Sequence, residues 1–231
     1  MLPLLLSQSL VGFPVSGAAR RFAVGIDVGT GSARAGLVDV ETGELCATRK
    51  QVIQTWTPRP EYYQQSSDDI WEACANCVRG ALSDAGIEGS QVVGIGFDAT
   101  CSLVCLDGDH QPIGTDPTEP DESEKNIILW MDHRATAQAD SINAKGHERL
   151  STVGGTISPE MEIPKIAWLR EHMPSAFTRA SSNGGKFLDL ADFLAYRATD
   201  YATDVRSLCT VVCKWAYDAN ADGTGLGWDR R

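Results

Sequence analysis

The sequence is poor in basic side chains and contains no long hydrophobic run. Lys and Arg number 20 against 31 Asp and Glu, which gives the 231-residue chain a formal net charge of -11. Such a charge repels nucleic acid and anionic lipid, so neither is expected as a partner. No stretch of about 18 apolar residues occurs, so no membrane-spanning helix is expected. A ligand that carries phosphate would need backbone amides, a metal ion or a few local cations.

Two common phosphate-binding motifs are also missing. The P-loop pattern G-x-x-x-x-G-K-[ST] does not occur anywhere in the chain. The glycines at positions 29, 31 and 36 do not match the dinucleotide pattern G-x-G-x-x-G, because strand-like sequence follows them instead of a helix. The P-loop class is therefore excluded, and the dinucleotide-binding class is disfavoured.

Cysteine is present in an odd number, at positions 46, 74, 77, 101, 105, 209 and 213. In a chain of this size, scattered cysteines indicate reduced, mostly buried thiols in a cytoplasmic protein. Cys74 and Cys77 have the spacing of a zinc-ligand pair, but they lie within an amphipathic helical pattern. This context favours structural thiols and leaves zinc as the alternative.

The first 21 residues differ from the rest, since they contain no acidic residue. Their apolar run is short and interrupted, and no basic residue precedes it, which argues against a secretory signal. We expect residues 1–21 to be a disordered leader, with organelle targeting as the alternative. The folded part is expected to begin near Phe22.

Apolar periodicity after Phe22 predicts a mixed α/β layout. Ser66 or Ser67 caps a first helix that Gly86 ends, and Pro164 opens another. The apolar run at 91–97 is expected to be a buried central strand. The remaining predicted strands cover 22–27, 35–40, 45–53 and 103–106, and the remaining helices cover 134–145 and 188–197.

Two strands end in an aspartate followed by small residues. Asp27 precedes Val-Gly-Thr-Gly-Ser at 28–32, and Asp98 precedes Ala-Thr-Cys-Ser at 99–102. The first turn could face a phosphate with its backbone N–H groups and the Thr30 hydroxyl, while Asp27 holds a divalent ion through water. The alternative is an Asx turn that only shapes a hairpin. The repeat of strand, acid, Thr and strand suggests two similar corners that face one gap.

Five segments in register resemble the FGGY carbohydrate kinases over residues 22 to 217, and their closest similarity is to the D-ribulokinase-like pentulose kinases. They are 25–32, 94–103, 130–135, 158–169 and 206–215, which read GIDVGTGS, GIGFDATCSL, WMDHRA, SPEMEIPKIAWL and RSLCTVVCKW. The resemblance implies a ribonuclease H-like α/β fold, the N-terminal lobe of the actin-like ATPase and sugar kinase architecture. It also implies a mixed sheet with flanking helices.

The resemblance further implies site residues, with ATP, Mg²⁺ and a pentulose as ligands. The ATP phosphates would meet Asp27, Gly29, Thr30, Gly31 and Ser32, with Asp27 also on the metal. The sugar would meet Asp98, Thr100, Cys101, Trp130, Asp132, His133 and Glu160. Carboxylates accept from sugar hydroxyls, His can donate to a carbonyl, and Trp offers an apolar face. Structural alternatives remain: His133 and Trp130 in the core, Asp132 as a helix cap.

The catalytic base of the family, an Asp, is expected beyond residue 231. Residues 218–231 form a Gly-rich tail in which no aspartate has the expected context, so the chain is expected to be the N-terminal part of a kinase that phosphorylates a primary hydroxyl. Alone it should be inactive, marginally stable, and apolar on its surface near Trp215, Tyr217 and Trp228. A non-catalytic sugar-binding or interaction fragment and an actin or heat-shock type ATPase are the alternatives. A homodimer of the full-length form is left open.

Overall fold

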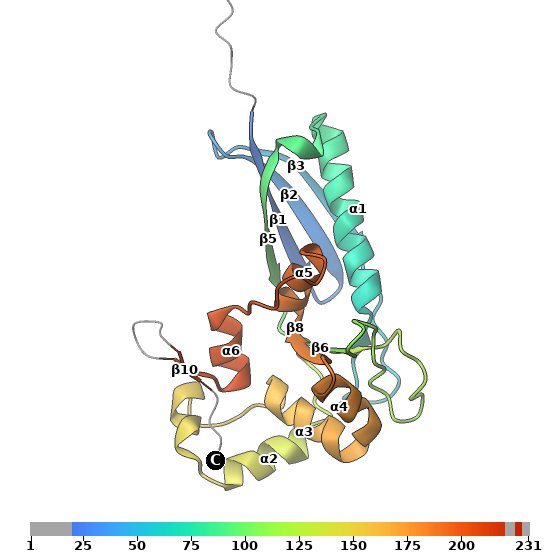
Figure 1. Ribbon diagram of the computed structural model, residues 1–231, viewed down its shortest axis with the longest axis vertical. Helices are drawn as coiled ribbons and strands as arrows, with labels where there is room; N and C mark the ends of the chain where they lie inside the picture. Colours follow the sequence, from blue (N-terminus) through green and yellow to red (C-terminus); the bar gives the residue numbers. More distant parts are fainter. Residues whose placement is uncertain (1–19, 220–224, 228–231) are drawn as a thin grey trace, which may run out of the picture.

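The computed structural model describes residues 20–219 and 225–227. The expected leader falls outside these residues except for Arg20 and Arg21, and so do 220–224 and 228–231, with Trp228 among them. The described chain forms an elongated α/β structure with one sheet and a long helix at one end and a second sheet with shorter helices at the other (Figure 1).

The first sheet has the strand order β3-β2-β1-β5. Its strands are β1 (Phe22–Gly29), β2 (Ser32–Asp39), β3 (Leu45–Val52) and β5 (Val92–Ala99). β1, β2 and β3 are antiparallel neighbours, whereas β5 runs parallel to β1. The sheet is therefore mixed, as the sequence predicted, and the ends of β1 and β5 lie at the same edge.

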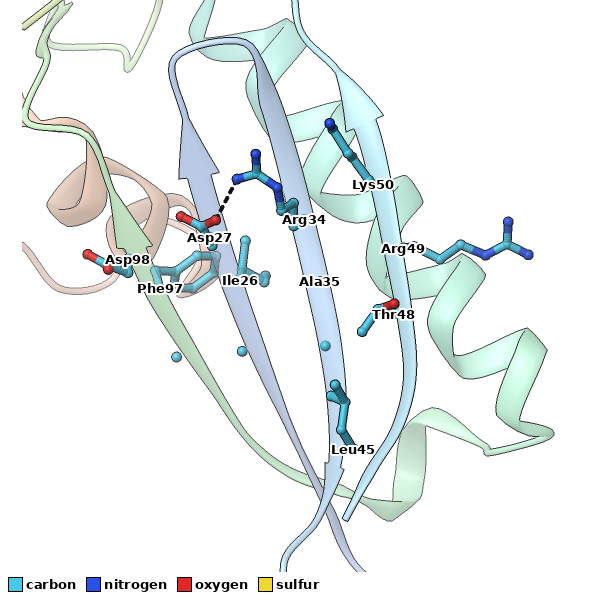
Figure 2. Close-up of a pocket in the computed structure, with 13 residues that line it drawn as sticks. Ile26, Asp27, Arg34, Ala35, Leu45, Thr48, Arg49, Lys50, Phe97 and Asp98 are labelled. Carbon is cyan, nitrogen blue, oxygen red and sulfur yellow. Dashed lines mark hydrogen bonds and ion pairs between the residues drawn. The ribbon is translucent and has the colours of Figure 1, made fainter. Parts of the chain in front are cut away.

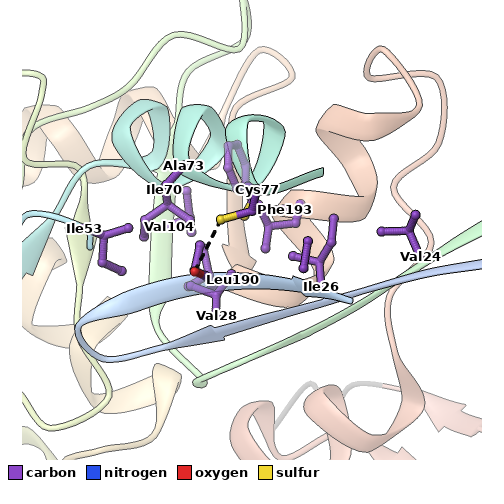
Figure 3. Close-up of a cluster of buried hydrophobic side chains, with 14 of the residues drawn as sticks. Val24, Ile26, Val28, Ile53, Ile70, Ala73, Cys77, Val104, Leu190 and Phe193 are labelled. Atoms are coloured by element: carbon purple, nitrogen blue, oxygen red, sulfur yellow. Dashed lines mark hydrogen bonds between the residues drawn. The ribbon is translucent and has the colours of Figure 1, made fainter. Parts of the chain in front are cut away.

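Helix α1 (Ser67–Ala85) covers one face of this sheet. The hydroxyl of Ser66 accepts from the backbone N–H of Asp69 at the start of the helix, and Gly86 ends it with a positive φ of 64°. Alternate residues of β1 point toward the helix because successive strand side chains face opposite sides. The resulting core contains Val24, Ile26, Val28, Ile70, Ala73 and Cys77, with Leu190 and Phe193 from a later helix (Figure 3).

β5 is not the buried central strand that its apolar sequence predicted. It lies at the edge of the sheet within the described chain, and Val93 and Ile95 are 59% and 53% exposed. An apolar run indicates that a strand is suited to burial on both faces. It does not indicate which residues cover the strand, or whether they belong to the described part of the chain.

The second sheet has the order β4-β7-β6-β8, and all its pairs are antiparallel. Its strands are β4 (Gln64–Gln65), β6 (Leu103–Leu106), β7 (Ile127–Ile128) and β8 (Lys186–Asp189). β5 and β6 thus belong to different sheets, so the corner that follows Asp98 is not a second hairpin. The loop at 100–102 carries the chain from the first sheet to the second.

Five further α-helices and two short 3₁₀ turns complete the described residues, with a small pair of strands. They are η1 (Gly89–Gln91), α2 (Thr136–Ala144), η2 (Glu148–Val153), α3 (Glu162–His172), α4 (Pro174–Ser181), α5 (Leu190–Ala198), α6 (Leu208–Trp215), β9 (Asp218–Ala219) and β10 (Gly225–Gly227). The predicted helices match α2, α3 and α5 with shifted ends. None of the described helices is long and apolar enough to cross a membrane.

Two expectations about burial need correction. Only Cys74, Cys77 and Cys105 are buried, whereas Cys209 and Cys213 are exposed on α6. The expected apolar surface at Trp215 is also wrong, since this side chain is only 8% exposed. The Arg206 guanidinium lies 5.1 Å from the Trp215 ring and helps to cover it. The exposed apolar side chains lie mainly on the first sheet instead.

Candidate functional site

The tip of the β1–β2 hairpin is built to present backbone N–H groups. Gly29 and Ser32 pair across the hairpin, which leaves Thr30 and Gly31 as a two-residue turn. Their carbonyls point inward: Gln65 Nε2 donates to the Thr30 carbonyl at 2.7 Å, and the Ile53 N–H donates to the Gly31 carbonyl at 3.2 Å. No described group accepts a hydrogen bond from the N–H of Thr30 or Gly31. The turn therefore has two free donors, a suitable arrangement for an anion. Ser32, by contrast, is buried and only 4% exposed.

Arg34 adds a cation beside this turn. Its Nη1 lies 2.6 Å from Asp27 Oδ2, and both side chains are about half exposed, at 46% and 57%. A Cβ on Gly29 would lie 3.3 Å from Arg34 Nη1, so the glycine makes room for the guanidinium. Sequence analysis did not select Arg34. The signal that could have found it is its register position, because strand pairing places it opposite Asp27.

Asp27 and Asp98 lie side by side on neighbouring strands and line one hollow of about 890 Å³ (Figure 2). In the register of the sheet, Asp98, Asp27, Arg34 and Lys50 form a continuous row over β5, β1, β2 and β3. Each strand in the row carries one charge, with like charges adjacent at both ends. Like charges directly opposite each other destabilise a sheet, so this row favours a ligand over a purely structural role.

The residues of this hollow fit a magnesium ion carried by a nucleotide. Mg²⁺ is usually held by one or two carboxylates together with substrate phosphates and waters. Asp27 and Asp98 supply two adjacent carboxylates at the edge of the sheet. Among residues 20–219 and 225–227, no group of three or more His, Cys, Asp or Glu could hold a metal alone. A site that depends on the ligand's own oxygens is consistent with both observations.

Trp130 connects the tip of the β1–β2 hairpin to the loop at 100–102. Its indole Nε1 donates to the Thr30 hydroxyl at 3.1 Å, and its backbone N–H donates to the Ser102 hydroxyl at 3.2 Å. The Thr100 N–H donates to the carbonyl of Val28 at 3.0 Å. The hairpin, the 100–102 loop and Trp130 are thus tied together directly. The structure brings these predicted residues to one place even though they are far apart in sequence.

A buried lysine fixes the next two loops. The Lys165 ammonium is fully buried and donates to the carbonyls of Leu129, Trp130 and Glu160, at 2.8, 3.4 and 3.1 Å. Burial lowers the pKa of Lys165, while the charge of Glu162 opposes that shift. Because the ammonium binds both segments, it holds the Trp130 and Glu160 loops in fixed positions.

His133 lies between two glutamates at the rim of this corner. Its Nε2 is 3.3 Å from Glu160 Oε1, and its Nδ1 is 3.4 Å from Glu61 Oε2. The imidazole side chain is 41% exposed, which does not fit the alternative of a core histidine. Sequence analysis did not select Glu61, because it lies in a loop with no recognisable motif. The backbone of Glu61 has a positive φ of 67°.

Asp132 is neither exposed to a ligand nor a helix cap. The residue is fully buried, and its two oxygens accept from the Arg134 guanidinium, from the Arg134 N–H and from the Tyr63 N–H, at 2.7 to 3.0 Å. Helix α2 begins after Ala135, with no side-chain cap. Direct contact between Asp132 and a sugar would require this ion pair to open. Its geometry suits a supporting role behind Trp130 and His133.

Cys101 faces Lys214, a residue that the sequence analysis did not assign to the site. The half-buried Lys214 ammonium of α6 interacts with the Cys101 thiol, and the charges of Glu160 and Glu162 also act on it. Burial raises the pKa of Cys101, and the Lys214 ammonium opposes that shift. The segment 206–215 was recognised, but only the packing of α6 shows that its lysine reaches the 100–102 loop.

Several known proteins are similar to this chain in sequence. Residues 22–213 match the family model of the FGGY family of carbohydrate kinases, N-terminal domain. The chain is 44% identical over 209 residues to an FGGY carbohydrate kinase domain-containing protein of Homo sapiens, covering 90% of this chain and 35% of the relative. It is 40% identical over 214 residues to a D-ribulokinase of Saccharomyces cerevisiae, covering 91% and 28%. The chain thus spans about a third of the length of these relatives.

Solved structures show the same fold. A xylulose kinase from Rhodospirillum rubrum matches with a TM-score of 0.62 at 18% identity, covering 76% of this chain and 33% of that one. A glycerol kinase from Plasmodium falciparum, solved with ADP, matches with a TM-score of 0.62 at 16% identity, covering 78% and 35%. The expected α/β fold, the N-terminal lobe of the actin-like sugar kinase architecture, is confirmed.

Proposed function

Because the chain belongs to the FGGY family of carbohydrate kinases, we propose that it supplies the phosphate-side and sugar-side corners of an ATP-dependent pentulose kinase. The observation that carries this proposal is the shared hollow of Asp27 and Asp98, next to a hairpin tip with two free backbone N–H groups. Had these carboxylates pointed to opposite sides of the molecule, no common site could have formed.

On the phosphate side, the hairpin and Arg34 bind and orient ATP. The N–H groups of Thr30 and Gly31 donate to phosphate oxygens, and Arg34 can leave Asp27 to pair with the charge that develops on the transferred group. Asp27 would hold the Mg²⁺, and Asp98 beside it would meet the sugar. When bound, that ion would neutralise part of the negative charge of the phosphates. Ser32 contributes through its backbone, because its side chain is buried.

On the sugar side, the two loops fixed by Lys165 present complementary groups to a ketose. Trp130 offers an apolar ring to the C–H face, and the Glu160 carboxylate accepts from hydroxyls. His133 and Lys214 are donors placed to meet a carbonyl or hydroxyl oxygen. Thr100 and Cys101 line the corner between them. Asp132 does not contact the sugar directly; through its ion pair with Arg134 it supports the loop that carries Trp130 and His133.

D-ribulose is the proposed sugar, with transfer to a primary hydroxyl. The support is the similarity to relatives named D-ribulokinase and ribulokinase. The match with this chain covers 28% and 36% of those two proteins. The heat-shock type ATPase has no comparable support, since the relatives and structures reported above are carbohydrate kinases.

We further propose that the 231 residues bind ligand but do not turn over. The match covers only the N-terminal domain of the family, and the hollow that Asp27 and Asp98 line is open to solvent. Sugar phosphorylation also needs a carboxylate that takes the hydroxyl proton, and no residue of this chain is assigned that role. Release of ADP at the rate of a full-length relative would contradict this proposal.

Calorimetric titration of the purified chain tests the binding proposal. D-Ribulose should bind, and Lys214→Gln should weaken it by about tenfold, the cost of one charged hydrogen bond. Lys145→Gln, at an exposed lysine remote from the corner, is the matched control. Binding of Mg·ADP without any binding of D-ribulose would favour the ATPase alternative.

A further inference from the structure

A buried acid without a hydrogen-bond partner lies behind the sugar-side corner. Glu162, in the first turn of α3, is fully buried, and neither of its carboxylate oxygens has a partner among the described residues. Buried polar groups are almost always paired, so an orphaned carboxyl group requires an explanation. A structural role alone does not provide one, because an apolar side chain would pack there at lower cost.

The charged groups that face Glu162 come from three elements. Lys165 lies on its own helix, Asp189 caps α5, and Lys214 lies on α6. Two thiols, Cys101 and Cys105, also feel its charge from the loop at 100–102 and from β6. The Arg134 guanidinium and the Asp132 carboxylate act on the same cluster through Lys165.

Most of these cations are already committed to other groups. The Lys165 ammonium donates to three backbone carbonyls. The Arg134 guanidinium donates to Asp132 and to the Thr115 carbonyl. The Lys214 ammonium has three N–H donors and interacts with the Cys101 thiol. In the described part of the chain, Lys214 is therefore the cation near Glu162 with donors to spare.

We propose that Glu162 is a positioning residue that decides where the Lys214 ammonium points. As a neutral acid it leaves Lys214 beside Cys101, facing the sugar-side corner. As a carboxylate it draws the ammonium inward and weakens the corner's hold on an oxygen of the sugar. The sugar part of this inference rests on the proposed function, whereas the movement of Lys214 does not.

The titration range of Glu162 makes this effect measurable. Burial raises its pKa to about 8, although the Lys165 charge opposes the shift. Glu162 is then mostly protonated at pH 7 and mostly ionised at pH 9. The corner should accordingly bind sugar about tenfold more weakly at pH 9 than at pH 7, as expected for the loss of one charged hydrogen bond.

Cys101 reports on Lys214 without any sugar present. A thiolate forms more readily beside an ammonium, so alkylation of Cys101 by iodoacetamide depends on where Lys214 lies. The rate is followed by mass spectrometry of the Cys101 peptide at pH 7 and 9. Glu162→Gln, which keeps the shape of the neutral acid, should increase the rate at pH 9 by roughly threefold or more. Glu171→Gln removes an exposed acid from the same helix and should leave the rate unchanged.

A double variant separates positioning from direct repulsion. If Glu162 acts through Lys214, the effect of Glu162→Gln should largely disappear in a Lys214→Gln background. An equal effect in both backgrounds, or none in either, overturns the proposal. The sugar arm is calorimetry with D-ribulose, where Glu162→Gln should abolish the loss of affinity at pH 9. Absence of D-ribulose binding at both pH values would count against the proposed function alone, and the alkylation rates would still decide the role of Glu162.

Discussion

Two aspartate–arginine ion pairs show how burial changes the role of the same chemical contact. Asp27 and Arg34 meet across a hairpin at the phosphate-side corner, where both side chains are about half exposed. Asp132 and Arg134 meet at the sugar-side corner, where both side chains are fully buried. The exposed pair can open for a ligand at little cost. The buried pair, in which both Asp132 oxygens have hydrogen-bond partners, fixes the loop next to Trp130 and His133.

The largest effect is expected from breaking the buried pair. Asp132→Asn leaves the Arg134 charge buried without a counter-ion and should lower the free energy of unfolding by about 3–5 kcal/mol. Urea denaturation followed by circular dichroism measures this loss. A change below about 1 kcal/mol would mean that the pair is not desolvated, and the contrast with Asp27 would be lost.

Glu162 and Asp189 are buried carboxyl groups that, unlike Asp132, are not paired with an arginine of the described chain, and they extend the comparison to the pH dependence of stability. Burial raises the pKa of Glu162 to about 8 and that of Asp189 to about 7. The folded state then keeps protons that the unfolded state has lost, so stability is fully present near pH 4 and declines as pH rises toward 8. Between pH 5 and pH 8 the titration of Glu162 alone should lower the free energy of unfolding by about 3–4 kcal/mol.

Urea denaturation over this pH range in Glu162→Gln checks the prediction. The variant should lose much less stability than the parent chain, because the glutamine cannot ionise. Parallel pH curves for the two proteins would show that Glu162 does not titrate in this range.

The link between the two corners should have an intermediate effect. Trp130→Phe and Thr30→Val each remove one partner of the indole–hydroxyl hydrogen bond. A double-mutant cycle should give a coupling energy of about 1 kcal/mol in stability. Thr30→Ser keeps the hydroxyl and serves as the control that preserves the coupling. A coupling near zero would indicate that the corners are positioned independently.

The smallest effect on stability is expected from the exposed pair. Asp27→Asn should change the free energy of unfolding by less than about 1 kcal/mol, because exposed ion pairs contribute little. The same variant should nevertheless weaken the binding of Mg·ADP in calorimetry, since it removes a proposed metal ligand. Strong destabilisation with unchanged nucleotide binding would reverse the roles assigned to the two pairs.

Local patterns predicted much of the fold and part of the site. The strand, turn and strand around Thr30 and Gly31 were correct, as were the caps of α1, because these depend on neighbouring residues. The exposure of β5 was wrong, since an apolar strand carries no information about what covers it. The thiols were expected to be mostly buried, but Cys209 and Cys213 are exposed on α6.

By itself, the sequence determined the alternation of strands and helices, the hairpin turn after Asp27 and the five segments that identify the family. These features are local, because they arise from side-chain periodicity, turn chemistry and short runs of residues. Only the tertiary structure decided that Arg34 faces Asp27, that Lys214 reaches Cys101, and that Glu162 is enclosed without a partner. Contacts of this kind depend on strand register and helix packing between distant segments, and those fix the charge and burial that each side chain experiences.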